Sequence, residues 1–218
     1  MIVAVDKPIG WTSFDVVKKV RQITGERKVG HGGTLDPFAE GVLVIGIGRE
    51  STRQLGKINN SIKSYHATLR LGELTDTLDN TGKTVQEMPI PQLIESEVVA
   101  ALSGFLGHQM QVPPMFSAKK VNGRRLYKLA RDEITIEREP VPITIENIEL
   151  IDFGICSIKF SVTCSKGTYV RQLGADIATV LGTVGHLTRL KRVEAGGYTH
   201  DDCINFEKIE ETWMSSIV

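Results

Sequence analysis

The chain has 218 residues, of which 41% are hydrophobic and 24% are charged, and its formal net charge is zero. This composition is typical of a globular protein and excludes an intrinsically disordered chain. No apolar run approaches the roughly 20 residues that a membrane-spanning helix needs. The first ten residues, "MIVAVDKPIG", have neither the basic start nor the cleavage site of a signal peptide. The sequence therefore predicts a cytoplasmic protein with one substantial domain.

The predicted secondary structure mixes helices and strands along the whole chain. Thr12 or Ser13 can begin the first helix and Gly25 can end it. In chain order, the predicted elements are a strand at 3–5, a helix at 14–24, a strand at 42–47, a helix at 51–60, a strand from Tyr65 to Leu71, a helix at 91–103, strands at 143–151 and 155–164, and a helix at 168–182. Because this order lacks a strict βαβ rhythm, we expect an α+β fold with a mixed β-sheet flanked by helices.

The neutral total hides opposed local charges. Residues 1–70 carry 11 Lys or Arg against 6 Asp or Glu, and residues 153–192 carry 6 against 1, whereas residues 71–112 and 193–218 each carry 1 against 6. Within the balanced segment 113–152, "SAKKVNGRRLYKLARDE" places six cations before its first acid. One such run can be a solvated helix face, but three separate basic segments favour a polyanionic partner.

Metal and cofactor sites are not predicted. Cys156, Cys164 and Cys203 stand far apart without a CxxC pair, and the five His are scattered singly. The stretch "GIGRES" at 46–51 has a strand–GxG–helix pattern, but it lacks the other residues of a nucleotide-binding loop. A nucleotide site there is a remote alternative.

Asp36 is the first candidate for chemistry. It ends the glycine-rich stretch "GHGGTLDP" immediately before an apolar strand, and glycine lets a ligand approach the backbone closely. A loop that feeds a buried strand holds its last side chain at a sheet edge, where function is often found. The local sequence leaves open that Asp36-Pro37 is only a turn.

Arg171 and Tyr65 are the next candidates. Arg171 falls in the first helical turn beside an apolar stripe, so its guanidinium is expected to be only partly solvated and to need a carboxylate. The alternatives are a side chain that reaches water, or a pair with Asp176. Tyr65 falls on the buried face of its strand, either as a core aromatic or with a functional hydroxyl. His31, in the glycine-rich stretch, is equally ambiguous by itself.

Five blocks of sequence carry a resemblance to a known family. They are "DKPIGWTS" (6–13), "GHGGTLDPFAEGVLVIGIG" (30–48), "KSYHATLRLGELTDTLDNTG" (63–82), "VPPMFSAKKVNGRRLYKLAR" (112–131) and "SKGTYVRQLGADIATVLG" (165–182). In this order they strongly resemble the TruB family of tRNA pseudouridine-55 synthases, from about residue 5 to about 200. The resemblance implies the pseudouridine synthase fold and the isomerisation of uridine to pseudouridine in the T arm of tRNA, without cofactor or metal. We also expect a monomer.

The resemblance also implies roles for single residues. Matching positions give catalytic roles to Asp36, Tyr65 and Arg171. Substrate contacts are implied for His31, where the target base has left the stack, for Lys7, which supports the site, and for Leu190, near the base. The expected tRNA-binding surface lies in the basic run and comprises Lys119, Lys120, Arg124, Arg125 and Lys128.

The residue types suit this reaction. The bond from C1′ to N1 breaks and a bond from C1′ to C5 forms, so no redox group is needed. A carboxylate is ionised at neutral pH, and it can attack the sugar or stabilise positive charge on it. The sequence leaves both roles open. Because a base within a folded arm is out of reach, it must be flipped out, and phosphate contacts offset the lost stacking.

The C-terminal part departs from the family. The match predicts a catalytic domain at 1–200, followed by a short tail or helix at 201–218, with no evident RNA-binding domain of the PUA type. Two further functions stay open: an RNA-binding or tRNA-folding module without catalysis, and a subunit of a guide-RNA-dependent synthase. A short C-terminus disfavours the second.

Overall fold

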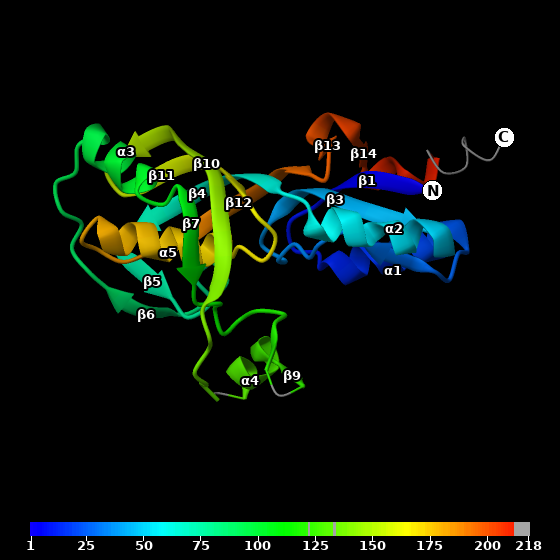
Figure 1. The fold of residues 1–218 in the computed structure, drawn as a ribbon, viewed down its shortest axis with the longest axis horizontal. Helices are drawn as coiled ribbons and strands as arrows, with labels where there is room; N and C mark the ends of the chain where they lie inside the picture. Colours follow the sequence, from blue (N-terminus) through cyan, green and yellow to red (C-terminus); the bar gives the residue numbers. More distant parts are fainter. Residues whose placement is uncertain (122, 133, 212–218) are drawn as a thin grey trace. The chain divides into compact units, whose positions relative to one another are not determined.

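The computed structural model describes residues 1–121, 123–132 and 134–211 (Figure 1). Its elements, in chain order, are β1 (Ile2–Lys7), α1 (Ser13–Thr24), β2 (Val29–His31), β3 (Glu40–Ile47), α2 (Arg49–Asn60), β4 (Lys63–Leu71), β5 (Glu73–Thr75), β6 (Thr84–Glu87), α3 (Glu95–Ser103), β7 (Gly107–Gln111), β8 (Lys120–Val121), β9 (Arg124–Arg125), α4 (Leu126–Arg131), β10 (Val141–Gly154), β11 (Ser157–Cys164), α5 (Val170–Val180), β12 (Gly185–Ala195), β13 (Tyr198–Thr199), β14 (Cys203–Asn205) and the short 3₁₀ helices η1 (His200–Asp202) and η2 (Phe206–Lys208). Within these residues, none of the helices is both long and apolar enough to cross a membrane.

The chain forms two compact units. Unit 1 comprises residues 1–66 and 190–218, and unit 2 comprises residues 67–189. Strands β4 and β12 contribute residues to both. Unit 1 is therefore built from two separate stretches of chain, and unit 2 lies between them in the sequence.

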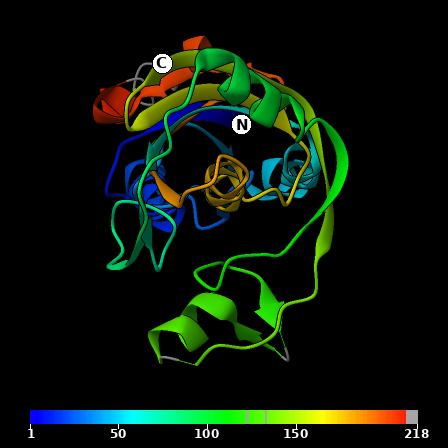
Figure 2. The same ribbon diagram turned by 90° about the vertical axis from the view of Figure 1, so that its left-hand side faces the viewer.

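Unit 1 is a small mixed sheet with two helices. β1 pairs antiparallel with β3 and parallel with β14, and β3 also pairs with β2 and with the end of β12. Figure 2 draws α1 (blue) and α2 (cyan) on the same side of these strands. A cluster of buried apolar side chains fills the unit: Ala4, Val42, Val44, Leu55 and Ala195. The predicted boundary near residue 200 falls inside this unit, where β14 joins β1.

Helix α1 begins and ends as its sequence predicts. The Thr12 hydroxyl accepts the Asp15 N–H (3.0 Å), and the Asp15 carboxylate accepts the Thr12 N–H (3.1 Å), which is a capping box. Gly25 ends the helix in the left-handed conformation, with φ of 68°. Val16, Val17 and Val20 form the buried face. Helix and caps are thus local properties of this stretch.

In unit 2, the strands of the sheet follow the order β12, β4, β11, β10, β7. β10 pairs antiparallel with both β11 and β7. Along β4, Ala67, Leu69 and Leu71 are buried whereas Arg70 is exposed, which confirms the predicted alternation. Helix α5 packs so closely on this sheet that a Cβ at Gly174 would lie 2.8 Å from the Leu187 side chain.

The helices of unit 2 are shorter than predicted. α3 begins at Glu95 rather than at 91, because the Ile94 N–H is capped by the Glu97 carboxylate (3.0 Å). α5 ends at Val180, whose side chain is exposed, while Leu181 is buried just beyond it. Strands β8 and β9 and helix α4 form a lobe that follows β7 and precedes β10 in the chain (Figure 1). Mixed strands flanked by helices confirm the α+β prediction.

Candidate active site

Asp36 lies in the turn that joins β2 to β3. The turn is closed by a hydrogen bond from the Ala39 N–H to the Asp36 carbonyl oxygen (3.1 Å). The next carbonyl, that of Pro37, accepts the N–H of Gly10 from the loop after β1 (2.7 Å). Asp36 is half-buried. Its carboxylate therefore stands on a backbone that is fixed both within the turn and from a neighbouring loop.

The buried guanidinium of Arg192 holds the main chain on both sides of this turn. Its Nε donates to the carbonyl oxygen of Val42 (2.7 Å), and its terminal nitrogens donate to those of Gly33 (3.2 Å) and Thr34 (3.5 Å). Arg192 has no exposed surface. Because a guanidinium carries its donors in a rigid plane, this one side chain fixes the residues before and after Asp36.

The backbone of Arg192 approaches the same segment. Residues 191 and 192 of β12 pair in parallel with residues 40 and 41 of β3. Gly41 has φ of 103°, and a Cβ at this position would overlap the carbonyl oxygen of Arg192. Only glycine fits such a close approach with a positive φ. The glycine-rich composition of the stretch is thus explained in part by packing.

Lys7 is enclosed by its own loop. Its Nζ donates to the carbonyl oxygens of Pro8 (2.9 Å) and Trp11 (2.7 Å), and the residue has no exposed surface. Burial lowers the pKa of Lys7 from 10.5 to about 8, while the negative charge of Asp36 opposes this shift and the positive charge of Arg192 adds to it. Lys7 thus supports the loop beside Asp36, and its contact with substrate stays a prediction.

His31, Tyr65 and Leu190 also belong to unit 1. Burial lowers the pKa of His31, and the charge of Arg192 acts in the same direction, so the ring is neutral at pH 7. Its Nδ1 has no hydrogen-bond partner within the described part of the chain. Tyr65 and Leu190 are 8% and 6% exposed. Burial of the Tyr65 ring is as predicted, and the roles of all three remain predictions.

Arg171 belongs to unit 2, and it is more deeply buried than predicted. Only 4% of the residue is exposed, so it does not reach water. Its guanidinium donates to the carbonyl oxygens of Thr77 (2.5 Å) and Phe116 (2.8 Å) and pairs with the carboxylate of Asp79 (3.4 Å). Asp176 accepts a hydrogen bond from Gln172 (2.9 Å). The predicted pair of Arg171 with Asp36 stays a prediction.

The loop that carries Asp79 is tightly bonded. The Asp79 Oδ1 accepts the hydroxyls of Thr77 (2.8 Å) and Thr81 (2.5 Å), and the Thr75 hydroxyl donates to the Asp79 carbonyl oxygen (2.7 Å). Between them, Leu78 adopts a left-handed backbone with φ of 62°, which is unfavourable for a side chain of its kind. This loop therefore presents one carboxylate oxygen to Arg171.

The sequence analysis did not single out Arg192 or Asp79. Arg192 follows Leu190 by two residues on the same buried face of β12, so the period of two could have indicated a buried arginine. Asp79 stands in "TDTLDNTG", where Thr and Asp at alternating positions are typical of turns in which side chains bond the backbone.

The basic run contributes unequally to an exposed surface. Arg124 and Lys128 are exposed, and Arg124 pairs with Asp132 (3.0 Å). Lys119 is half-buried and donates to the Glu139 carbonyl oxygen (3.4 Å). Lys120 and Arg125 face each other in the β8–β9 pair through their backbones, and their side chains lie outside what the structure describes.

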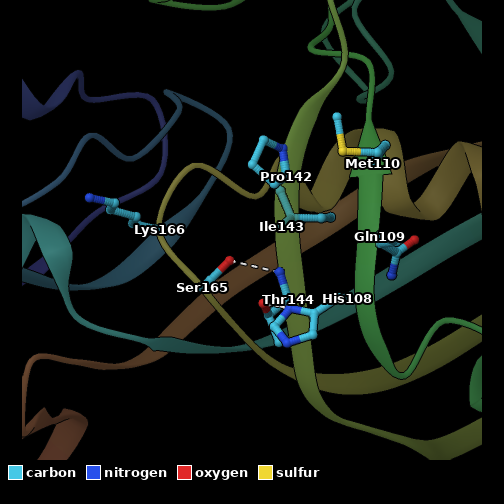
Figure 3. Close-up of a pocket in the computed structure, with 8 residues that line it drawn as sticks. All are labelled: His108, Gln109, Met110, Pro142, Ile143, Thr144, Ser165 and Lys166. Carbon is cyan, nitrogen blue, oxygen red and sulfur yellow. Dashed lines mark hydrogen bonds between the residues drawn. The ribbon is translucent and has the colours of Figure 1, made fainter.

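A hollow in unit 2 lies apart from these residues (Figure 3). It has a volume of about 400 Å³ and is lined by His108, Gln109, Met110, Pro142, Ile143, Thr144, Ser165 and Lys166. Its polar groups bond one another: the Thr144 N–H donates to the Ser165 hydroxyl (2.9 Å), and the Thr144 hydroxyl meets the His108 ring (2.9 Å). Across the described ranges, no cluster of His, Cys, Asp or Glu could hold a metal ion.

The sequence and the fold resemble known proteins. Residues 21–170 match the model of a family described as "TruB family pseudouridylate synthase (N terminal domain)". A protein named tRNA pseudouridine synthase B from Hydrogenovibrio crunogenus is 47% identical over 209 residues, which cover 96% of this chain and 69% of that protein. One of the same name from Clostridium novyi is 46% identical over 208 residues, covering 95% and 71%.

A solved structure has the same fold. A chain in a Cbf5–Nop10–Gar1 complex is 24% identical and superposes with a TM-score of 0.77, over 100% of this chain and 56% of that one. At this identity the likeness concerns the fold alone. Together with the family match, it confirms the pseudouridine synthase fold.

Proposed function

We propose that Asp36 isomerises the uridine at position 55, in the T arm of tRNA. This chain belongs to the TruB family of pseudouridylate synthases, and it isomerises uridine to pseudouridine in tRNA. The observation that carries the proposal is the Asp36 turn, whose flanks are bonded to Gly10 and to Arg192. Such a backbone holds a carboxylate in one orientation, which a reaction at a single sugar carbon requires.

The reaction rearranges bonds within one nucleotide. The bond from C1′ to N1 breaks, the uracil turns, and C1′ bonds C5. The proton on C5 leaves and N1 gains one, so no electrons are gained or lost. The Asp36 carboxylate either bonds C1′ transiently or stabilises positive charge there.

Arg171, Tyr65 and His31 complete the proposed site. Arg171 would be the arginine of the site, Tyr65 would stack on the uracil, and Leu190 would pack near it. His31 is half-buried and its lowered pKa favours the neutral ring, so it can occupy the space of an extruded base at little electrostatic cost. Support for Arg171 comes from its burial and its fixed geometry.

The exposed cations Arg124 and Lys128 are the proposed phosphate contacts, together with Lys119, Lys120 and Arg125 of the same run. Neutralised phosphates release counterions, so affinity for RNA should fall steeply as salt rises. Substitution of Arg124 and Lys128 by Ala should reduce the slope of log affinity against log salt concentration by an amount that corresponds to about two phosphate contacts. A salt dependence equal to that of the wild type would count against this surface.

The test uses an unmodified T-arm stem-loop and measures pseudouridine without added metal, nucleotide or guide RNA. Asp36→Asn should slow the conversion by more than about a thousandfold while RNA affinity stays within about threefold. Asp201→Asn, an exposed acid of the same unit, is the matched control and should behave like the wild type.

Other outcomes identify the part that fails. Conversion of a stem-loop whose target uridine is replaced by cytidine would contradict position 55. Turnover only after a guide RNA is added would favour the guide-dependent alternative, and binding without turnover in the wild type would favour the module without catalysis. The proposal also includes a monomer, a cytoplasmic location and a reaction without metal or cofactor. Light scattering tests whether the protein is a monomer. Added chelator tests whether the reaction proceeds without metal.

A further inference from the structure

Unit 1 exposes large apolar side chains beside the Asp36 turn. Ile9, Trp11 and Phe14 are 60%, 36% and 51% exposed, and all three lie in the short stretch that joins β1 to the start of α1. We refer to these three residues as the apolar rim. Single exposed apolar residues are ordinary, but three within six positions form a patch of the kind that marks an interaction site.

The stretch that carries the apolar rim is hydrogen-bonded to the Asp36 turn. The N–H of Gly10, between Ile9 and Trp11, donates to the Pro37 carbonyl oxygen (2.7 Å). The hydroxyl of Ser13, next to Phe14, accepts the Leu35 N–H (2.8 Å). These bonds reach the residues on either side of Asp36. The rim therefore borders the place where the reacting nucleotide is proposed to lie.

The rim is also held rigidly. The Lys7 ammonium donates to the Trp11 carbonyl oxygen (2.7 Å). The Trp11 ring meets the Phe206 ring edge-on, with centroids 4.7 Å apart and planes at 70°. In this T-shaped pair the two rings are not stacked on each other, and Trp11 keeps 36% of its surface exposed. A preformed aromatic platform loses little conformational entropy when a partner binds.

Two cations lie near one ring of the rim, that of Phe14. The Lys18 Nζ lies 5.2 Å from the centre of the Phe14 ring, and the Arg21 guanidinium carbon lies 5.8 Å from it. Lys18 also pairs with the Asp15 carboxylate (3.8 Å), and Arg21 also donates to the carbonyl oxygen of Val29 (2.9 Å). Aromatic rings interleaved with cations are typical of surfaces that bind single-stranded RNA, because bases stack on the rings while phosphates meet the charges.

We propose that the apolar rim is an RNA-contact surface. Trp11 and Phe14 stack on unpaired nucleotides next to the extruded uridine, and Lys18 and Arg21 contact the adjoining phosphates. The proposal rests on the proposed function, since it takes the reacting nucleotide to lie at Asp36. RNA is the partner we choose because the cations over the rim favour a polyanion and because the bonds to the turn make the rim continuous with the site.

Binding is measured in the Asp36→Asn background, so that turnover does not enter. Trp11→Ala and Phe14→Ala should each weaken affinity for a labelled T-arm stem-loop by about tenfold, which is the usual cost of losing one stacked base. Trp11→Phe and Phe14→Tyr keep a ring and should restore most of it. Ile155→Ala, at a 95% exposed apolar residue between β10 and β11, is the control and should leave affinity unchanged.

Unchanged affinity in both alanine variants, with circular dichroism and melting like those of the wild type, would overturn the proposal. Normal RNA affinity combined with an altered oligomeric state in light scattering would also overturn it, since the rim would then be a protein contact. A wild type that binds the stem-loop without isomerising it would contradict the proposed function, and the binding comparison would still decide the role of the rim.

Fluorescence gives an independent measurement. The chain contains two Trp, so Trp213→Phe leaves Trp11 as the remaining one. Stacking of a base on the indole should quench its emission when the stem-loop is added. An emission that does not change at saturating RNA would contradict stacking at Trp11.

Discussion

Each unit buries an arginine, and the two side chains have different partners. In unit 1, Arg192 donates to the carbonyl oxygens of Val42, Gly33 and Thr34. In unit 2, Arg171 donates to two carbonyl oxygens but also pairs with the carboxylate of Asp79. The first arrangement uses the whole guanidinium to shape a loop, and the second joins a helix to a loop through opposite charges.

The difference concerns charge as well as geometry. The charge of Arg171 is paired with the Asp79 carboxylate 3.4 Å away. The charge of Arg192 acts on Lys7 and His31, and it lowers the pKa of both. In each case it adds to the effect of burial. In unit 1, the charge of Arg192 and the carboxylates of Asp36, Glu40 and Asp6 therefore act on Lys7 in opposite directions.

Removal of Asp79 should have the largest effect on stability. Asp79→Ala leaves the buried Arg171 without this carboxylate, and we expect the free energy of unfolding to fall by about 3 kcal/mol, measured in urea. Asp152→Ala, at an exposed acid of the same unit, is the control and should cost less than about 0.5 kcal/mol. A loss below about 1 kcal/mol for Asp79→Ala would mean that the pair contributes little.

Removal of the Arg192 guanidinium should have a smaller effect, because it leaves carbonyl oxygens rather than a charge without partners. Arg192→Met should lower the free energy of unfolding by about 2 kcal/mol. The rate of isomerisation should fall further than RNA affinity does, since the main chain on both sides of Asp36 loses its hydrogen bonds to Arg192. Lys191→Met, at the neighbouring residue, is the control. Equal losses of unfolding free energy and of isomerisation rate in both variants would contradict the role given to Arg192.

Lys7 should give the smallest effect, and it should depend on pH. The pKa of Lys7 is about 8 in the folded protein against 10.5 in the unfolded chain. Between these values the unfolded state binds more protons, so the free energy of unfolding rises with pH. From pH 8 to pH 9.5, the wild type should gain about 1.5 kcal/mol relative to Lys7→Met. Parallel profiles for the two proteins would contradict a buried, titrating ammonium.

Local sequence predicts the parts of the fold that depend on neighbours in the chain. The Thr12 cap, the Gly25 end of α1 and the alternation along β4 follow from residues within a few positions, and all are observed. The predicted start of α3 is wrong by four residues. The helix begins where the Glu97 carboxylate accepts the Ile94 N–H, and the apolar pattern does not decide this position.

The support of the site could not be predicted in the same way. Arg192 bonds residues 150 to 159 positions away, and Arg171 bonds Thr77 over 94 positions. A period of two can indicate that a strand residue is buried. It does not reveal which distant carbonyl oxygen accepts a hydrogen bond from that residue, or which distant carboxylate forms an ion pair with it. Asp36 can be proposed from the sequence because its glycine-rich surroundings are local, whereas the hydrogen bonds of Arg192 that hold its turn come from a distant part of the chain.

The discontinuity of unit 1 has a consequence for biosynthesis. The Asp36 turn emerges from the ribosome early, but the arginine that holds it is translated about 150 residues later, followed by the strand that pairs with β1. Because domains complete their folding only when all their strands are available, the nascent N-terminal segment must wait until β14, which ends at Asn205, has been translated before the Asp36 turn is fixed.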